Sequence, residues 1–84
     1  MCVFIKNLFV VIYIMKSDIL KDFGLRVKQL RLEHNWTQQD LADQSGFHKN
    51  YIGMVERGER NISLRNIEML AKAFGLNIQE LINF

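Results

Sequence analysis

The chain has 84 residues, with 11 lysines and arginines against 9 acidic residues and a single cysteine. This length fits one small domain with a modest core, to which a second copy of the chain would add buried surface. The net charge of +2 is too small to indicate a nucleic-acid binder by itself, and one cysteine excludes a disulfide framework and a cysteine-based zinc site.

Catalytic and metal-binding machinery is missing from the sequence. Cys2 lies far from both histidines, and no pair of carboxylates accompanies them. The sequence also contains no glycine-rich phosphate loop and no nucleophile motif. We therefore predict that the protein is not an enzyme and uses no metal, no cofactor and no small-molecule ligand.

Residues 1–15 form an apolar extension, because 13 of them are apolar and Lys6-Asn7 alone interrupt the run. The run is too short to span a bilayer and lacks the charge and small residues of a signal peptide. Its β-branched and aromatic residues are typical of a strand, which would have to pair with its copy in a dimer. Two further alternatives stay open: a natural start at Met15, with the first 14 residues an artefact or dispensable, and a membrane-tethered peptide organised by residues 3–15.

The first predicted helix spans residues 18–34, at the start of a domain of residues 16–84. Asp18 or Ser17 can cap it. Phe23, Val27, Leu30 and Arg31 recur at helical spacing and define its inner face. Gly24 weakens the helix by about 1 kcal/mol relative to alanine, and close approach of another helix would explain it.

Two short helices joined by a tight turn are predicted next. Thr37 can cap the first, with Asp40 as a weaker stand-in for the usual glutamate of a capping box. Gly46 suits the left-handed backbone at the end of this helix. The second helix runs from about Lys49 to Arg57. Two helices separated by a short turn with a glycine form the helix-turn-helix pattern.

A fourth helix begins after Ser63, which can cap it, and ends at Gly75. Its apolar residues recur at three- and four-residue spacing and predict a buried face. These residues are Leu64, Ile67, Leu70, Ala71 and Phe74.

The sequence Asn77-Ile78-Gln79-Glu80 resembles a capping box and predicts a short fifth helix. We expect Leu81 to close the core from this helix. Together, Ile78, Ile82 and Phe84 provide more apolar surface than one short terminal helix usually buries. We therefore predict that they form the interface of a two-fold homodimer. The alternative is that Phe84 folds back onto its own domain.

Many spaced positions between residues 18 and 83 resemble the Xre-type, lambda-repressor-like (Cro/cI) DNA-binding domains. The run at residues 56–75 is similar to restriction-modification controller proteins, although phage repressors and antitoxins share most of it. The resemblance implies an all-α, five-helix domain containing a helix-turn-helix. The matching positions are Gln38, Leu41-Ala42, Gly46, Tyr51-Ile52, Val55-Glu56-Arg57-Gly58 and Arg60-Asn61.

The resemblance also implies a partner for Arg31, which lies on an apolar face where an unpaired charge would be costly. That partner is Glu56, at the end of the second helix of the motif. The alternative is that Arg31 only covers apolar surface with its stem. Trp36 is predicted to be a lid on the core rather than a platform for bases.

In this architecture the second helix of the motif enters the major groove with its N-terminal residues against base edges. That position makes Lys49 and Asn50 the predicted base contacts, with Met54 one turn later. Lysine can donate to guanine O6 and N7, asparagine can pair with adenine, and methionine can touch a thymine methyl.

The alternative is that Lys49 and Asn50 are ordinary solvated residues at a helix start. His48 is a poor N-cap and Lys49 places a positive charge at the positive end of the helix, so two local rules are broken without a gain in stability, which is typical of functional positions. The interpretation requires that this end be presented outward, neither packed inside nor capped by its own chain.

The remaining predicted DNA contacts are to phosphate and sugar, which set register without selecting sequence. By resemblance, Gln38 would bond a phosphate and brace the first residues of the recognition helix. His48 and Tyr51 would lie at the groove edge. Arg57 lies at the end of the helix, where a glycine-containing loop begins. Arg60 and Asn61 lie in that loop and are assigned to contacts with the DNA backbone.

These observations predict a cytoplasmic transcription regulator that binds double-stranded operator DNA, an inverted repeat, as a homodimer. A restriction-modification controller or a phage-type repressor would fit. The alternative is an antitoxin or other protein-interaction module built on the same fold.

Overall fold

The computed structural model describes residues 18–84, and the predictions made for residues 1–15 lie outside this range. Within it the chain forms five helices and no strand, as predicted for the domain. They are α2 (Ile19–Glu33), α3 (Gln38–Ser45), α4 (Lys49–Glu56), α5 (Leu64–Ala73) and α6 (Ile78–Leu81).

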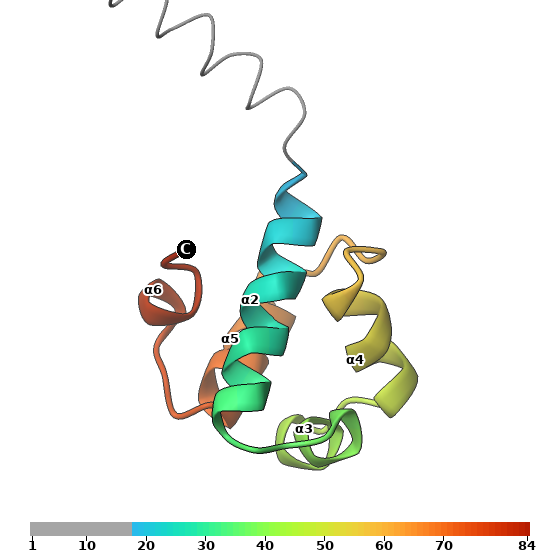
Figure 1. Ribbon diagram of the computed structural model, residues 1–84. Coiled ribbons are helices and arrows are strands. Elements are labelled where there is room, and N and C mark those ends of the chain that lie inside the picture. Colours follow the sequence, from blue (N-terminus) through green and yellow to red (C-terminus); the bar gives the residue numbers. More distant parts are fainter. Residues whose placement is uncertain (1–17) are drawn as a thin grey trace, which may run out of the picture.

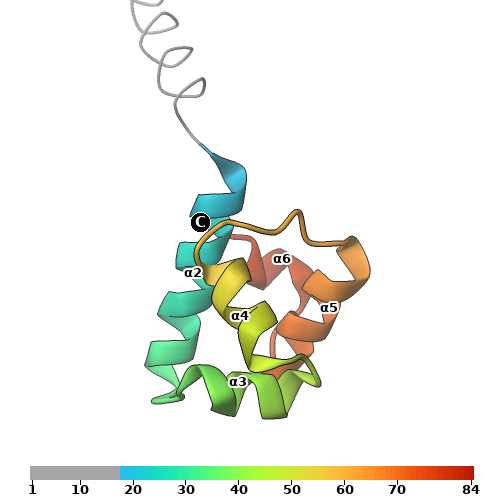
Figure 2. The same ribbon diagram turned by 90° about the vertical axis from the view of Figure 1, so that its right-hand side faces the viewer.

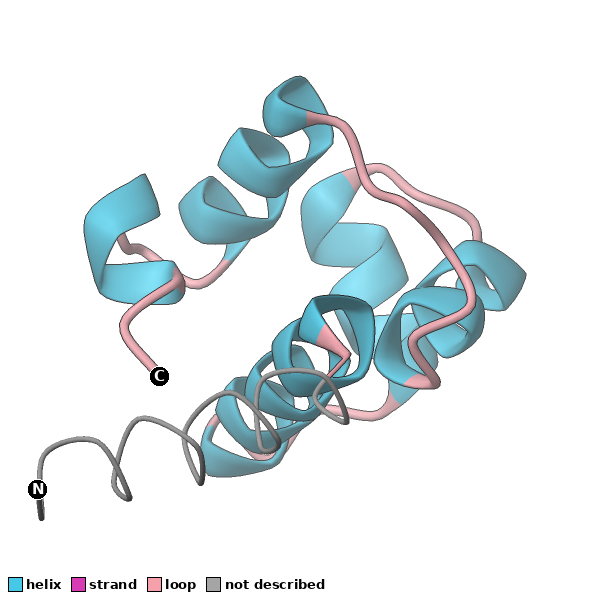
Figure 3. Cartoon of the chain, turned by 90° about the horizontal axis from the view of Figure 1, so that it is seen from above, coloured by secondary structure: helices cyan, strands magenta, loops and turns pink. Residues whose placement is uncertain are grey.

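The helices surround one core, with α2 at the front of Figure 1, α4 and α6 on its two sides and α5 behind it. Helix α3 crosses the lower end (Figure 2), where it packs against both α4 and α5. Seen from above, α2 and α5 lie on opposite sides of the core (Figure 3). Helix α4 also packs along α2, so the helix-turn-helix of α3 and α4 is supported from two directions.

Side-chain caps begin the helices where the sequence predicts them. Thr37 and Asp40 form a reciprocal capping box, with hydrogen bonds of 3.0 and 2.8 Å. Asn77 and Glu80 form a second one at α6. Ser63 accepts the backbone N–H of Asn66 at 3.1 Å at the start of α5. These caps satisfy backbone donors that the helices cannot pair internally.

The core consists of apolar side chains from every described helix, and Leu81 is fully buried as predicted. Trp36 is half-buried and stacks on Phe74 with ring centroids 5.9 Å apart, which agrees with a lid on the core. The prediction for Leu64 was wrong, because its side chain is 70% exposed. Leu64 is the first residue of α5, and its side chain borders a surface hollow with Arg65, Glu68 and Ile78.

Gly24 brings α2 against the backbone of α4, as predicted. A Cβ atom added to Gly24 would lie 2.4 Å from the Val55 carbonyl oxygen and 2.6 Å from that of Glu56. Real Cβ atoms do not approach backbone this closely. The spacing between these two helices is therefore set by main-chain contact.

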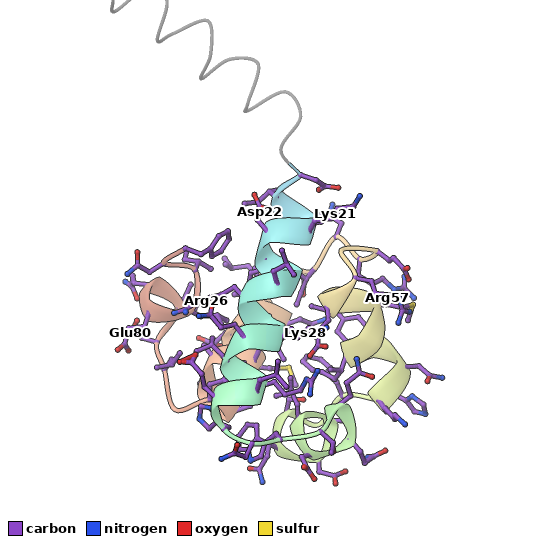
Figure 4. All side chains as sticks on the ribbon, viewed as in Figure 1. Lys21, Asp22, Arg26, Lys28, Arg57 and Glu80 are labelled. Atoms are coloured by element: carbon purple, nitrogen blue, oxygen red, sulfur yellow. The ribbon has the colours of Figure 1, made fainter. Side chains whose placement is uncertain are left out.

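Arg26 holds α6 against α2, a contact that the sequence did not suggest. Its Nε donates to the Leu81 carbonyl at 3.0 Å, and its Nη2 donates to the Glu80 carbonyl at 2.9 Å. Figure 4 shows Arg26 projecting from α2 toward the side of the molecule that carries Glu80. A cation at the last carbonyls of a helix also suits the negative end of its dipole.

Residues 18–84 contain neither a membrane-spanning helix nor a cluster of metal ligands. No helix there is both long and apolar enough to cross a membrane. No cluster of three or more histidine, cysteine or acidic residues there could hold a metal ion.

Candidate DNA-binding interface

The predicted ion pair between Arg31 and Glu56 is present and fixes α4 to α2. The Arg31 Nε donates to Glu56 Oε2 at 2.6 Å, and Nη2 donates to Oε1 at 3.1 Å. Both residues are buried, at 8% and 7% exposure. The Arg31 Nη1 also donates to the Trp36 carbonyl at 2.8 Å, so one guanidinium joins α2, α4 and the segment before α3. Such a bidentate pair fixes direction as well as distance.

Gln38 completes this buried network, but differently from our expectation. Its Nε2 donates to Glu56 Oε1 at 3.1 Å, so it braces the last residue of α4 rather than the first. Its amide also lies close to Gly53, in the middle of the helix. Gln38 starts α3, and the hydrogen bond therefore ties together the two helices of the motif.

The prediction that His48 is a poor N-cap was wrong. Its Nδ1 accepts the backbone N–H of Asn50 at 3.0 Å, which is the bond that a capping serine or aspartate would make. The end of α4 is therefore capped by its own chain, and the capping rule is not broken at this terminus. The cap uses only a backbone group, however, and the Lys49 and Asn50 side chains are both exposed. Their outward presentation is what base contact requires, so our exclusion of a cap was too strict.

The structure brings several of the predicted DNA contacts to one face. Lys49, Asn50 and Met54 line a single surface concavity, which they share with Gln38, Gly53 and Arg57. The Lys49 ammonium, the Asn50 amide and the Met54 thioether thus lie side by side. They can contact guanine, adenine and the thymine methyl group, respectively.

Tyr51 lies at the side of α4, with its ring against Phe47 at a centroid distance of 4.9 Å. Its hydroxyl accepts a hydrogen bond from Asn66 Nδ2 at 3.0 Å. The hydroxyl hydrogen remains available, so a phosphate oxygen could accept it. Asn66, on α5, was not among the predicted site residues.

Arg57 pairs with Glu59 just beyond α4. The Arg57 Nε donates to Glu59 Oε2 at 2.9 Å, and Nη2 donates to Oε1 at 3.1 Å. These hydrogen bonds, followed by the charge of its partner, raise the pKa of Arg57. The hydrogen bonds with Arg57 lower the pKa of the Glu59 carboxyl below its ordinary value. Because the carboxyl pKa is lowered, the pair persists to a lower pH than an ordinary glutamate would allow, and it is lost as the pH falls through that lowered value.

Arg60 and Asn61 are exposed in the loop between α4 and α5. Neither lines the concavity on α4. Asn61 instead borders an apolar hollow together with Ile82 and Phe84. Arg60 and Asn61 thus lie outside the concavity that the predicted base contacts line.

The three predicted dimer residues line more than one surface hollow. Ile82 and Phe84 are 46% and 55% exposed and line the hollow beside Ile19, which is 66% exposed. Ile78 is half-buried and lines different hollows, next to Glu68 on α5. The Phe84 ring also lies 6.4 Å from that of Phe23, so Phe84 partly folds back on its own domain.

Comparison with known proteins places this geometry in context. The helix-turn-helix family model matches residues 27–81. The control protein C.BamHI of Bacillus amyloliquefaciens is 42% identical over 71 residues, covering 83% of this chain and 88% of that protein. The crystal structure of the restriction-modification controller protein C.AhdI from Aeromonas hydrophila is 45% identical, with a TM-score of 0.70, and covers 76% of this chain and 96% of that one.

A third similar structure contains DNA. It is the restriction-modification controller protein C.Esp1396I, crystallised as a tetramer in complex with its natural 35 base-pair operator. It is 30% identical to this chain, with a TM-score of 0.71, and the match covers 80% of this chain and 92% of that one.

Proposed function

This chain belongs to the helix-turn-helix family of DNA-binding transcription regulators, and from that membership we propose that it is a restriction-modification controller that binds operator DNA as a homodimer. Its work is binding and not catalysis. It would act in the cytoplasm, where the DNA of a bacterial restriction-modification system lies.

The outward presentation of Lys49 and Asn50 is the observation that carries the proposal. The Arg31–Glu56 pair and the Gln38 hydrogen bond fix α4 on α2 and α3, leaving its first residues exposed. Because these supports are buried or half-buried, the helix meets DNA already in place and little ordering is required on binding. Base contacts from a helix held in this way follow the major-groove geometry of the motif.

The remaining contacts are made with the sugar-phosphate backbone of the DNA. We assign these contacts to Gln38, Tyr51, Arg60 and Asn61, along with the His48 ring at the groove edge. The exposed cation Arg60 would release counterions from the duplex, so its loss should reduce the salt dependence of binding by about one unit of slope.

A second copy of the chain would place two recognition helices about 34 Å apart, on successive turns of one DNA face. The exposed apolar residues Ile19, Ile82 and Phe84 supply the surface for that contact. With no ligand or catalytic domain in residues 18–84, control would follow the concentration of the protein through dimerisation and operator occupancy.

Selection from random duplexes tests the base contacts. The unaltered protein should select an inverted repeat, whereas Lys49→Ala and Asn50→Ala should each lose preference at one position per half-site, by about 1–3 kcal/mol. Gln29→Ala is the control, because Gln29 is an exposed residue of α2 and should leave selection unchanged. If both α4 variants kept the full sequence preference, Lys49 and Asn50 would not be the base contacts.

A further inference from the structure

The pair formed by Arg57 and Glu59 lies beside the face of α4 assigned to base contact. Figure 4 shows Arg57 on the side of α4 that faces away from α2. Arg57 follows Gly53 by one helical turn, and its Nη1 would lie only 3.1 Å from a Cβ atom at Gly53. The guanidinium is therefore folded back along the helix, over the one position there that has no side chain. It shares its concavity with Lys49, Asn50 and Met54.

Glu59 is held in register with α4 by the main chain. Gly58 adopts a φ of +75°, a left-handed conformation that most residues avoid. Its N–H donates to the Val55 carbonyl at 3.0 Å, and the N–H of Glu59 donates to the Met54 carbonyl at 2.9 Å. These two bonds form a Schellman motif, which fixes the backbone on which the carboxylate stands.

The geometry of the pair leaves one edge of the guanidinium unused. Glu59 accepts from Nε and from Nη2. An arginine has five N–H donors, so both hydrogens of Nη1 and one of Nη2 remain. Those donors form a planar fork of the kind that matches O6 and N7 of guanine. A side chain held at its Nε side and free at the other presents this fork without further ordering.

The charge of the pair argues against a phosphate contact. Arg57 and Glu59 together carry no net charge, and a carboxylate next to the DNA backbone would be repelled. A neutral pair therefore contributes little to the counterion release that drives phosphate binding. The acceptors of guanine are neutral, and they bind best to donors that are held in a fixed direction. The Glu59 carboxylate holds the Arg57 guanidinium in one direction.

We propose that Arg57 contacts a guanine base of the operator through Nη1 and Nη2, that Glu59 is its positioning residue, and that Gly53 provides the space. This inference rests on the proposed function, because it assigns a further base contact to the same helix. It also gives the two arginines that follow α4 different roles, because Arg57 selects the base sequence and Arg60 sets the register of the protein on the DNA.

The experiment measures affinity for the selected operator and for a random duplex, at several salt concentrations. The variants are Arg57→Lys, Glu59→Gln and Gly53→Ala. Glu33→Gln is the matched control, since it removes the same charge from an exposed residue at the end of α2. The Arg57 and Glu59 side chains are 58% and 53% exposed, so thermal unfolding should show these variants folded.

Arg57→Lys should lose preference for one guanine per half-site by about tenfold, because a lysine cannot form the planar fork. Glu59→Gln should bind the random duplex more tightly, with a salt slope larger by about one, yet discriminate that guanine less well. Gly53→Ala should weaken the same preference by displacing the guanidinium. Glu33→Gln should leave the preference unchanged.

Two results would overturn the inference while leaving the proposed function in place. Arg57→Lys could weaken binding to all sequences alike, which would make Arg57 a phosphate contact. Glu59→Gln could strengthen operator and random duplex equally, which would make Glu59 no more than a repulsive charge. If the unaltered protein selected no sequence at all, the proposed function would fail first.

Discussion

The residues that support α4 are more deeply buried than those that would touch DNA. Arg31 and Glu56 share two hydrogen bonds, and each has one further partner, the Trp36 carbonyl and Gln38 respectively. Within residues 18–84 no buried side-chain polar atom is left without a partner. A network satisfied in this way fixes one arrangement of the helices, whereas removing a single member leaves a buried charge uncompensated.

Replacing Glu56 with alanine should therefore lower stability before it alters DNA contacts. We expect a loss of roughly 3–5 kcal/mol in the free energy of unfolding, and a similar loss for Arg31→Ala. The double variant Arg31→Met/Glu56→Leu should be more stable than either single variant, because it leaves no lone buried charge. Denaturant unfolding measures all three, with Glu33→Ala as the exposed control. Unchanged unfolding of both single variants would mean that the pair contributes nothing.

Hydrogen bonds between residues close in sequence were predictable, and those across the fold mostly were not. Thr37 with Asp40 and Asn77 with Glu80 lie three residues apart, so the motif contains both partners. Arg26 binds carbonyls more than fifty positions away, and any surface arginine would have looked the same. The Arg31–Glu56 pair was predicted from the family resemblance. Such a resemblance indicates contacts between residues far apart in the sequence, which the spacing of residues along one helix cannot do.

Some local contacts escaped prediction as well. His48 caps α4 because its Nδ1 can accept as an aspartate oxygen does, although histidine is seldom counted among capping residues. Glu59 lies only two residues from Arg57, so their pairing had a sequence signal. That signal is weak, because adjacent opposite charges are common on surfaces and most contribute little.

At the scale of elements, the contact of α2 with α4 depends on Gly24. Gly24→Ala should destabilise the domain by about 1–3 kcal/mol, because the added methyl group would meet the carbonyls of Val55 and Glu56. Helix propensity alone predicts the opposite sign, a gain of about 1 kcal/mol. The melting temperature decides between them.

Gly53→Ala is the control for this prediction. Gly53 also lies inside a helix, but an added Cβ there would meet only the ends of the Arg57 and Gln38 side chains, which can move. Stability should hold or rise in this variant. Equal stability of the Gly24 variant and the unaltered protein would mean that the two helices can separate at little cost.

Helix periodicity predicted which elements form, but it could not tell where each helix runs past its neighbours. Leu64 fits the apolar spacing of α5 as well as Leu70 does, yet one is 70% exposed and the other fully buried. Ile78 likewise lies one helical turn before Ile82, yet Ile78 is half-buried and Ile82 is exposed. Burial at helix ends depends on the packing of other elements, which spacing within one helix does not contain.

For the whole molecule, the hollow lined by Ile19, Ile82 and Phe84 is the surface that we expect a second copy to cover. Ile82→Asp should convert the dimer to a monomer in sedimentation and weaken binding to a full inverted repeat, because a buried unpaired carboxylate is costly at an interface. Leu25→Asp is the control, since Leu25 is 63% exposed on the outer face of α2. A dimer that survives Ile82→Asp and dissociates with Leu25→Asp would move the interface to that face.

The main-chain contact at Gly24 has a consequence for how operators differ in strength. At Gly24 the two helices touch through their backbones, with no side chain there that could change rotamer, so the recognition helix has little freedom to tilt. Adaptation to an imperfect operator then falls to the nucleic acid, which must twist, kink or narrow its grooves to meet a fixed template. The ranking of natural sites should accordingly follow the mechanical softness of base steps that the protein never contacts.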